Sequence, residues 1–350
     1  MKTRITLSFG LAILMTSAAV AGGVAPKGGP KFNLNLLVSD QAGVAAFTDP
    51  NLVNPWGISH APAQPQWVSD NGTDLSTLYD QNTGQPQSLI VNIPLGAPTG
   101  TIYAPPGSGF MVTENGVSGT ATFLFDTESG AIEGWSAGVD LNNAIVAVDN
   151  SAKGSVYKGL AFDAANKHLL AADFVNNQVE IYDNKFKKVG GFTDPSLPKH
   201  FAPFNVAVLN GKVYVAFAKR QKHGGDEIDK KGLGYVDVFD TSGNLQQHLI
   251  SNGDLDAPWG LTIAPTGFGG LDGDLLVGNF GDGEIHAFDP NTGDELATLK
   301  DSNGKTLKID GLWSVDAGPN SSVTFTAGPD DESHGLLGLI QPVGAAIASK

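Results

Sequence analysis

The sequence predicts an all-β protein, a six-bladed β-propeller of four-stranded blades closed by its N-terminal strand. Two observations predict this fold. A unit of roughly 50 residues recurs six times along the chain, a period typical of propeller blades. The chain also contains 45 glycines among its 350 residues, nearly twice the usual share of about 7%. Glycines between short β-type runs indicate strands joined by tight turns.

Each unit opens with a short motif that often combines proline, tryptophan and glycine. Pro55-Trp56-Gly57 and Pro258-Trp259-Gly260 are its clearest copies. The six copies begin at Pro55, Pro98, Tyr157, Pro203, Pro258 and Leu312. A β-type run follows each copy, at residues 66–69, 110–113, 168–172, 212–217, 274–278 and 322–326. We expect the motif and the run to form the innermost and second strands of each blade.

The third strand of five units ends in a tyrosine or phenylalanine followed by aspartate. The five aspartates are Asp80, Asp126, Asp183, Asp240 and Asp289. An aspartate at the end of a strand accepts hydrogen bonds from the backbone amides of a tight turn. We therefore interpret these five carboxylates as turn residues.

The closure of the ring follows from a missing strand. The sixth unit ends after its third strand, at residues 335–340, and a strand without a blade precedes the first unit, at residues 32–38. Because an open ring would expose a sheet edge, we expect the N-terminal strand to complete the last blade. Residues 32–341 then form a single propeller domain, followed by a C-terminal tail at residues 342–350.

The first residues predict export. Lys2 and Arg4 precede an apolar run, and Ala19-Val20-Ala21 offers a small-residue cleavage site, the pattern of a secretory signal peptide at residues 1–21. Residues 22–31 are predicted to be a flexible leader. No later segment is apolar for long enough to span a membrane. We expect a secreted or periplasmic protein after cleavage near Ala21.

Charge and composition restrict the partners. The formal net charge is −15 and the chain contains no cysteine, so no disulfide framework stabilises it. A strongly negative surface disfavours nucleic acids, whereas a small molecule or an extracellular polymer remains compatible with it. We expect a monomer.

One end of the ring gathers the candidate site residues. Strand directions alternate within a blade, so innermost strands begin at the same end of the blade where second strands finish. The strand starts contribute the predicted ligand-binding residues Trp56, Lys158, Phe204, Trp259 and Trp313. The second strands finish at the predicted metal ligands Asp70, Glu114, Asp173 and Asn279, and two of these are followed by the further ligand-binding candidates Asn71 and Asn115.

Three carboxylates that converge on one axis repel each other unless a cation or protons intervene. Hard oxygen ligands favour one divalent cation, calcium, magnesium or manganese, and no organic cofactor is implied. Two plainer interpretations stay open. The aromatic ring is as consistent with packing between blades as with ligand binding, and strand-end aspartates commonly satisfy the backbone of a loop.

A second internal repeat lies outside the blades. Phe47-Thr48-Asp49-Pro50 recurs as Phe192-Thr193-Asp194-Pro195, ahead of the first and fourth units and therefore half a turn apart in a ring of six. We interpret both segments as bracing turns. The charged loop at residues 219–232 is interpreted as a solvated loop, with a lid over the channel as the alternative.

On these motifs the chain resembles a family of exported bacterial propellers of unknown activity, some of which carry a PEP-CTERM sorting tail. The resemblance covers about residues 33–340 and includes Asn54-Pro55-Trp56-Gly57, Asn279-Phe280-Gly281-Asp282-Gly283 and Asp310-Gly311-Leu312-Trp313. This chain lacks the sorting tail. It is more distantly similar to NHL-repeat, gluconolactonase and strictosidine-synthase propellers, a likeness of architecture that does not transfer function.

Two functions remain open. The first is a metal-assisted hydrolase or lyase that acts on a small sugar- or lactone-like molecule. The second is a non-catalytic propeller that binds a ligand or a protein at the same face. The sequence does not single out a general base for the first.

Overall fold

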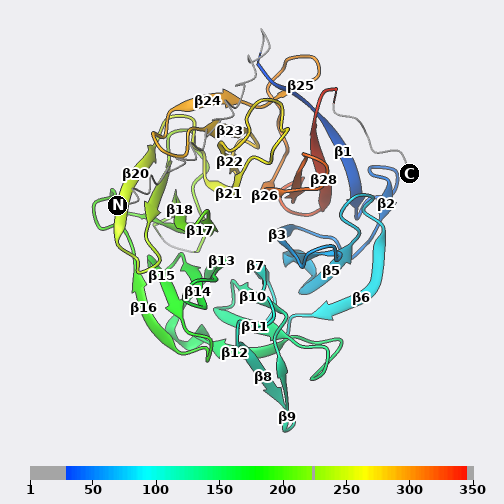
Figure 1. The fold of residues 1–350 in the computed structure, drawn as a ribbon, viewed down its shortest axis with the longest axis vertical. Coiled ribbons are helices and arrows are strands. Elements are labelled where there is room, and N and C mark those ends of the chain that lie inside the picture. Colours follow the sequence, from blue (N-terminus) through cyan, green and yellow to red (C-terminus); the bar gives the residue numbers. More distant parts are fainter. Residues whose placement is uncertain (1–28, 223–224, 345–350) are drawn as a thin grey trace, which may run out of the picture.

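The fold is a ring of six sheets, each built on a four-stranded antiparallel blade, arranged around a central channel (Figure 1). The computed structural model describes residues 29–222 and 225–344. The prediction of an all-β, six-bladed propeller is confirmed. The signal peptide and the first part of the leader, residues 1–28, lie outside the described residues, as does the end of the tail from residue 345.

Each blade runs outward from an innermost strand next to the channel (Figure 1). Blade one contains β3 (Pro55–His60), β4 (Gln66–Asp70), β5 (Leu75–Tyr79) and β6 (Pro86–Asn92). Blade two contains β7 (Pro98–Tyr103), β10 (Phe123–Thr127), β11 (Ala131–Trp135) and β12 (Ile145–Asp149). Blade three contains β13 (Tyr157–Asp163), β14 (His168–Asp173), β15 (Gln178–Tyr182) and β16 (Lys188–Phe192).

The remaining three blades follow the same order. Blade four contains β17 (Phe201–Leu209), β18 (Lys212–Lys219), β19 (Gly234–Phe239) and β20 (Leu245–Ser251). Blade five contains β21 (Pro258–Ile263), β22 (Leu275–Asn279), β23 (Ile285–Phe288) and β24 (Glu295–Thr298). Blade six contains β26 (Leu312–Ala317), β27 (Val323–Ala327), β28 (Leu336–Pro342) and β1 (Lys31–Ser39). Short pieces complete the structure: β2 (Phe47–Thr48), β25 (Lys300–Asp301) and the 3₁₀ turns η1 (Asn71–Thr73) and η2 (Ser151–Lys153).

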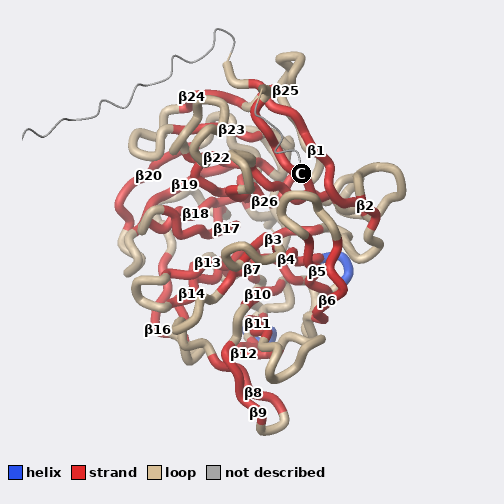
Figure 2. The backbone as a smooth tube through the Cα atoms, turned by 45° about the vertical axis from the view of Figure 1, so that its right-hand side comes forward, coloured by secondary structure: helices blue, strands red, loops and turns tan. Residues whose placement is uncertain are grey.

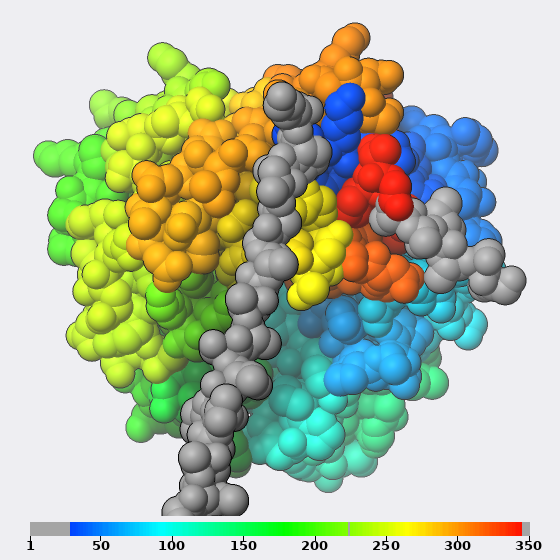
Figure 3. Space-filling view, turned by 45° about the horizontal axis from the view of Figure 1, so that its top comes forward, coloured from blue at the N-terminus to red at the C-terminus, as the bar shows by residue number. Residues whose placement is uncertain are grey.

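The N-terminal strand closes the ring as predicted. Strand β1 pairs antiparallel with β28 from Phe32, opposite Pro342, to Ser39, opposite Leu336. Figure 3 shows the blue residues of the N-terminal strand lying against the red C-terminal ones. Phe32, Leu37 and Val38 are buried, so the closing strand belongs to the apolar core as well as to the sheet.

The glycine of the opening motif allows neighbouring innermost strands to approach closely. A Cβ atom on Gly57 would lie 2.6 Å from the carbonyl oxygen of Thr99 in the next blade, and one on Gly100 would lie 2.4 Å from the amide nitrogen of Leu160. Both distances are far below van der Waals contact. The repeated glycine is therefore required by the packing of one blade against the next.

Blade two departs from the sequence prediction. Residues 110–113 were expected to form its second strand, but Met111–Glu114 is β8, which pairs with β9 (Val117–Thr120) in a separate hairpin. This hairpin projects from the ring (Figure 2). The second strand is instead β10, which was predicted as the third.

The shift changes the role of one aspartate. Asp80, Asp183, Asp240 and Asp289 bind turn amides as expected. Asp126 lies inside β10 instead, where its Oδ1 accepts hydrogen bonds from Thr99 Oγ1 and Gly100 N at 2.9 and 2.7 Å. Burial raises the pKa of Asp126 to about 7 despite these bonds. Its interpretation as a turn residue was wrong.

Among the described residues, no helix is long and apolar enough to cross a membrane.

Candidate functional site

The predicted aromatic ring forms a buried plug in the channel. The rings of Trp56 and Trp313 stack with centroids 3.4 Å apart, and Trp259 meets their edges at 5.9 and 5.8 Å. Phe204 lies 6.0 Å from Trp313. All four side chains are buried in one apolar cluster. The structure thus brings these predicted residues together, but as packed core that closes the channel and not as an exposed rim.

Lys158 is the charged member of this ring. Its Nζ lies 5.0 Å from the centroid of Trp56 and 5.8 Å from that of Phe204, within the range of cation–π attraction. The same nitrogen lies 2.8 Å from Glu128 Oε1 and 3.6 Å from Glu227 Oε2. The lysine comes from the start of β13, Glu128 follows β10, and Glu227 comes from the loop between β18 and β19. Three blades therefore supply one charged cluster above the aromatic plug.

Amide side chains connect this cluster to a third glutamate. Asn71 Nδ2 donates to Glu128 Oε2 at 3.0 Å. Asn54 Nδ2 donates to Glu332 Oε1 at 3.2 Å, and its Oδ1 accepts from Trp313 Nε1 at 2.9 Å. We call Lys158, Glu128, Glu227, Glu332 and Asn71 the Lys158 site.

The Lys158 site shifts the proton affinities of its members. Burial opposes the charged form of Lys158, but the Glu227 and Glu128 carboxylates outweigh it and raise the pKa of Lys158. Burial raises the pKa of Glu227 to about 7, although Lys158 acts in the opposite direction. The Glu227 side chain is only 9% exposed, whereas that of Glu128 is 29% exposed. One carboxyl group that exchanges its proton near neutral pH therefore lies beside a permanent positive charge.

One of the four predicted metal ligands, Glu114, lies apart from the channel. Glu114 lies on the hairpin of β8 and β9, exposed to solvent, because the true second strand of blade two is β10. Asn115 forms the tip of that hairpin and is also away from the channel. Both predictions of position were wrong.

The other three predicted ligands are held by local partners. Asp70 Oδ2 accepts from Thr77 Oγ1 at 2.8 Å, and Asp173 Oδ1 accepts from the amide of Asn176 at 3.2 Å. Asn279 Nδ2 donates to the carbonyl of Asp254 at 2.8 Å. Among the described residues, neither Asp70 nor Asp173 belongs to a cluster of three metal-ligating side chains. Asp70 Oδ1 and Asn279 Oδ1 accept no hydrogen bond from the described residues, and a cation shared by Asp70, Asp173 and Asn279 stays a prediction.

Three members of the Lys158 site were missed as site residues by sequence reasoning. Glu128, Glu227 and Glu332 lie in loops. The strand repeat does not align loop residues between the units, so it does not predict where these side chains lie. One signal was available: the charged loop at residues 219–232 had a lid over the channel as its alternative interpretation. Glu227 of that loop does contact Lys158.

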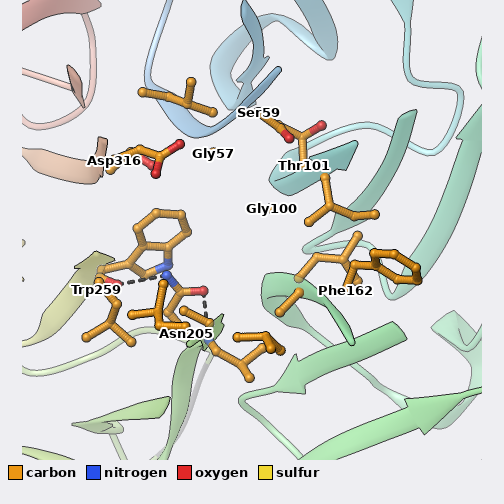
Figure 4. Close-up of a pocket in the computed structure, with 18 of the residues that line it drawn as sticks. Gly57, Ser59, Gly100, Thr101, Phe162, Asn205, Trp259 and Asp316 are labelled. Carbon is orange, nitrogen blue, oxygen red and sulfur yellow. Dashed lines mark hydrogen bonds between the residues drawn. The ribbon is translucent and has the colours of Figure 1, made fainter. Parts of the chain in front are cut away.

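A cavity of about 290 Å³ occupies the channel beyond the plug. Innermost strands of all six blades line it, and Figure 4 shows Trp259, Asn205, Phe162 and Asp316 around it. Asn205 Nδ2 donates to the carbonyl of Trp259 at 2.7 Å, so this polar group is satisfied within the wall. Burial raises the pKa of Asp316, against the effects of its backbone hydrogen bond and of His60. The cavity can hold a small molecule, but it carries fewer charged groups than the Lys158 site.

Groups that can hold a metal ion occur elsewhere in the part of the chain that the structure describes. Each combines a histidine with two carboxylates whose ligand atoms lie within 4.8 Å of one another. The groups are Asp194, Asp237 and His248; Asp254, His286 and Glu295; and Asp282, Glu284 and His286.

The fold and the central channel define this protein as a six-bladed β-propeller, and solved structures agree. A glucose dehydrogenase matches with a TM-score of 0.55 at 15% identity, over 90% of this chain and all of its own. Streptogramin B lyase matches with a TM-score of 0.52 at 10% identity, over 89% and 98%. Luciferin-regenerating enzyme matches at 0.54 and 15%, over 84% and 92%. At these identities the likeness shows the fold alone.

Sequence comparison places the chain in a family. No family model matches it. Uncharacterized protein L690 of Acanthamoeba polyphaga mimivirus is 31% identical over 339 residues, which cover 88% of this chain and 85% of the viral protein. Uncharacterized protein R648 of the same virus is 30% identical, over 88% and 80%. The chain belongs to the family of these proteins. Because these relatives are viral, they do not support the bacterial origin and the PEP-CTERM kinship expected from the sequence motifs.

Proposed function

We propose that the chain is an enzyme of the hydrolase or lyase class, which acts on a small molecule by proton transfer at the Lys158 site. The observation that carries this proposal is the buried contact between Lys158 and Glu227, with the pKa of Glu227 raised to about 7. A carboxyl group of this kind is suited to general acid–base catalysis at neutral pH. Enzymes occur among propellers of this shape, so the fold is compatible with catalysis.

The roles of the residues follow from their contacts. Glu227 accepts a proton from substrate carbon or from a water molecule, and then returns it to the leaving group. Lys158 holds Glu227 in position and keeps its carboxylate form accessible near pH 7. Asn71 and Glu128 offer polar groups to a neutral substrate that carries hydroxyl and carbonyl oxygens. A sugar- or lactone-like molecule has this chemistry.

Replacement of Glu227 by glutamine should lower kcat/KM by about 10²–10⁴-fold, because a general base contributes that much. The wild-type kcat/KM should rise with pH through about 7, since only the deprotonated carboxyl group accepts the proton. The measurement is the turnover of a panel of small lactones, cyclic esters and glycosides, with mass spectrometry to detect the products. Lys222→Gln, a change of an exposed residue in the same loop, should leave the rate unchanged. Equal rates for wild type and Glu227→Gln on every converted substrate would contradict the proposal.

A non-catalytic binding propeller is the second candidate. The observation that favours it is the polar lining of the Lys158 site, where Asn71, Glu128 and Lys158 are already joined by hydrogen bonds and an ion pair and can hold a polar ligand. In that case, the loops around the Lys158 site bind a ligand that is recovered chemically unchanged. The same panel distinguishes the two candidates, because a binding protein shifts in melting temperature without forming product.

The site is proposed to work outside the cytoplasm, in a periplasm or in the medium. The support is the signal-peptide pattern, which lies outside the described residues. Mass spectrometry of protein purified from its native source should find a mature N-terminus near Gly22. Recovery of the chain with Met1 intact in the cytoplasm would rule out export.

A further inference from the structure

A cluster at blade four is not used by the Lys158 site. Asp194 lies in the loop that leads into the blade, Asp237 in strand β19, and His248 in the outermost strand β20 (Figure 1). The two carboxylates are buried, while the histidine side chain is 46% exposed. The loop of Asp194 is the second copy of the Phe-Thr-Asp-Pro repeat.

The geometry of the three side chains is convergent. His248 Nδ1 lies 3.2 Å from Asp194 Oδ2 and also 3.2 Å from Asp237 Oδ1. Ligand atoms in a tetrahedral zinc site, with bonds of about 2.0–2.1 Å, lie about 3.3 Å apart. The spacing therefore suits three ligands of one tetrahedral ion. On its other side, His248 Nε2 lies 3.4 Å from Ser196 Oγ, a contact that helps to orient the ring with Nδ1 toward the carboxylates.

Buried oxygens in the cluster have few hydrogen-bond partners. Apart from the His248 ring, which lies 3.2 Å from Asp194 Oδ2, the buried Asp194 Oδ2 and Asp237 Oδ2 have no donor from another side chain or from the backbone among the described residues. Two neighbouring buried carboxylates repel each other and lose their hydration. A cation between them removes both penalties.

We propose that Asp194, Asp237 and His248 form a binding site for a divalent transition-metal ion, with zinc as the best match. Two carboxylate oxygens and one imidazole nitrogen are zinc ligands, and three protein ligands leave a fourth position for water. The half-exposed histidine marks the side from which the ion enters. The ion ties the incoming loop to the third and fourth strands of the blade, and thereby stabilises the junction between blades three and four.

The chain offers a matched control half a turn away. Asp49, in the first copy of the repeat, accepts hydrogen bonds from Tyr79 Oη at 3.0 Å and from Asn51 Nδ2 at 2.9 Å. No histidine belongs to that contact set among the described residues. The same loop motif is thus satisfied by hydrogen bonds in blade one, and it should not bind zinc there.

The test uses the full mature chain without an affinity tag, freed of metal with a chelator. Zinc titrated by calorimetry should bind at one site that depends on His248, and should raise the melting temperature. Cobalt should give the visible absorption of a four-coordinate ion. His248→Ala should weaken zinc binding by about 100-fold or more, because it removes a ligand and not merely an outer-shell partner. Asp49→Asn should leave zinc affinity unchanged.

Three results would overturn the proposal. The first is no zinc- or cobalt-dependent stabilisation of the wild type, which leaves the cluster as a hydrogen-bonded contact of His248 with two carboxyl groups. The second is equal zinc affinity in the wild type and His248→Ala, which places the ion elsewhere, for example at His286. The third is equal loss of zinc affinity in His248→Ala and Asp49→Asn. His248→Gln, at a half-exposed position, provides a second folded variant in which zinc affinity should also fall.

Discussion

A mature chain that lacks the residues up to Val38 should not fold to a closed ring. The truncation removes most of the strand that pairs with β28, and leaves an unpaired edge in blade six. It also removes Phe32, Leu37 and Val38, all buried. Each such side chain contributes about 2–5 kcal/mol, and a domain has only about 5–15 kcal/mol in total. We expect the truncated chain to aggregate or to lose its cooperative melting transition. Circular dichroism, recorded as the temperature rises, measures this transition.

A graded version of this experiment separates closure from general damage. Phe32→Ala should lower the free energy of unfolding by about 3–5 kcal/mol, because the ring packs against Phe268 with centroids 4.6 Å apart. Leu34→Ala, on the same strand but 40% exposed, should change it by less than about 0.5 kcal/mol. Equal melting temperatures for the truncated and complete mature chains would show that β1 does not close the ring.

The replacement of Lys158 by methionine should be the most damaging single substitution in the Lys158 site. It keeps the length of the side chain but leaves the Glu128 and Glu227 carboxylates without their cation. Breaking a buried ion pair costs about 3–5 kcal/mol. Lys185→Met, at an exposed position, is the control and should change the free energy of unfolding by less than about 0.5 kcal/mol.

The loss of stability in Lys158→Met should depend on pH. Folded Glu227 keeps its proton up to about pH 7, whereas the unfolded chain releases it near the ordinary pKa of 4.5. The unfolded state therefore binds fewer protons in this window, so stability falls as pH rises through it. Because Lys158 lowers the pKa of Glu227, its removal extends the window upward. Urea unfolding should show a larger difference between the variant and wild type at pH 8 than at pH 5. An equal difference at both values would remove Glu227 from the explanation.

The repeat in the sequence was sufficient to predict the six-bladed architecture. Five of the six opening motifs begin a strand at the predicted residue, and β17 begins two residues earlier, at Phe201. The missing sixth outer strand was also enough to predict closure. These features follow from blade packing, which places a glycine at this position in four of the six units and repeats the strand spacing in all of them.

The error in blade two has a local cause. The hairpin of β8 and β9 inserts a β-type run ahead of the true second strand, and a repeat search counts that run as the strand itself. Asn115-Gly116, both with positive φ, is the commonest sequence for a two-residue hairpin turn. Had this signal been used, Glu114 would have been assigned to a hairpin and not to the channel mouth.

The candidate site was harder to predict because its carboxylates come from loops. Lys158 and Asn71 stand at positions that the repeat defines and belong to the Lys158 site, and Trp56 lies next to it, with its ring centroid 5.0 Å from Lys158 Nζ. Glu227 and Glu332 have no equivalent in other blades, since their loops differ in length and sequence. Only the closed ring brings them toward the same lysine.

The pairing of Asn33 with Gln341 also sets an order of events during synthesis. Strand β1 has to wait for β28, which is synthesised about 300 residues later, while the intervening blades can pair among neighbours. A contact across almost the whole chain carries the largest loop-closure entropy and forms slowly. The ring is therefore completed only after β28 has been synthesised, and until then the nascent chain carries β1 without its antiparallel partner.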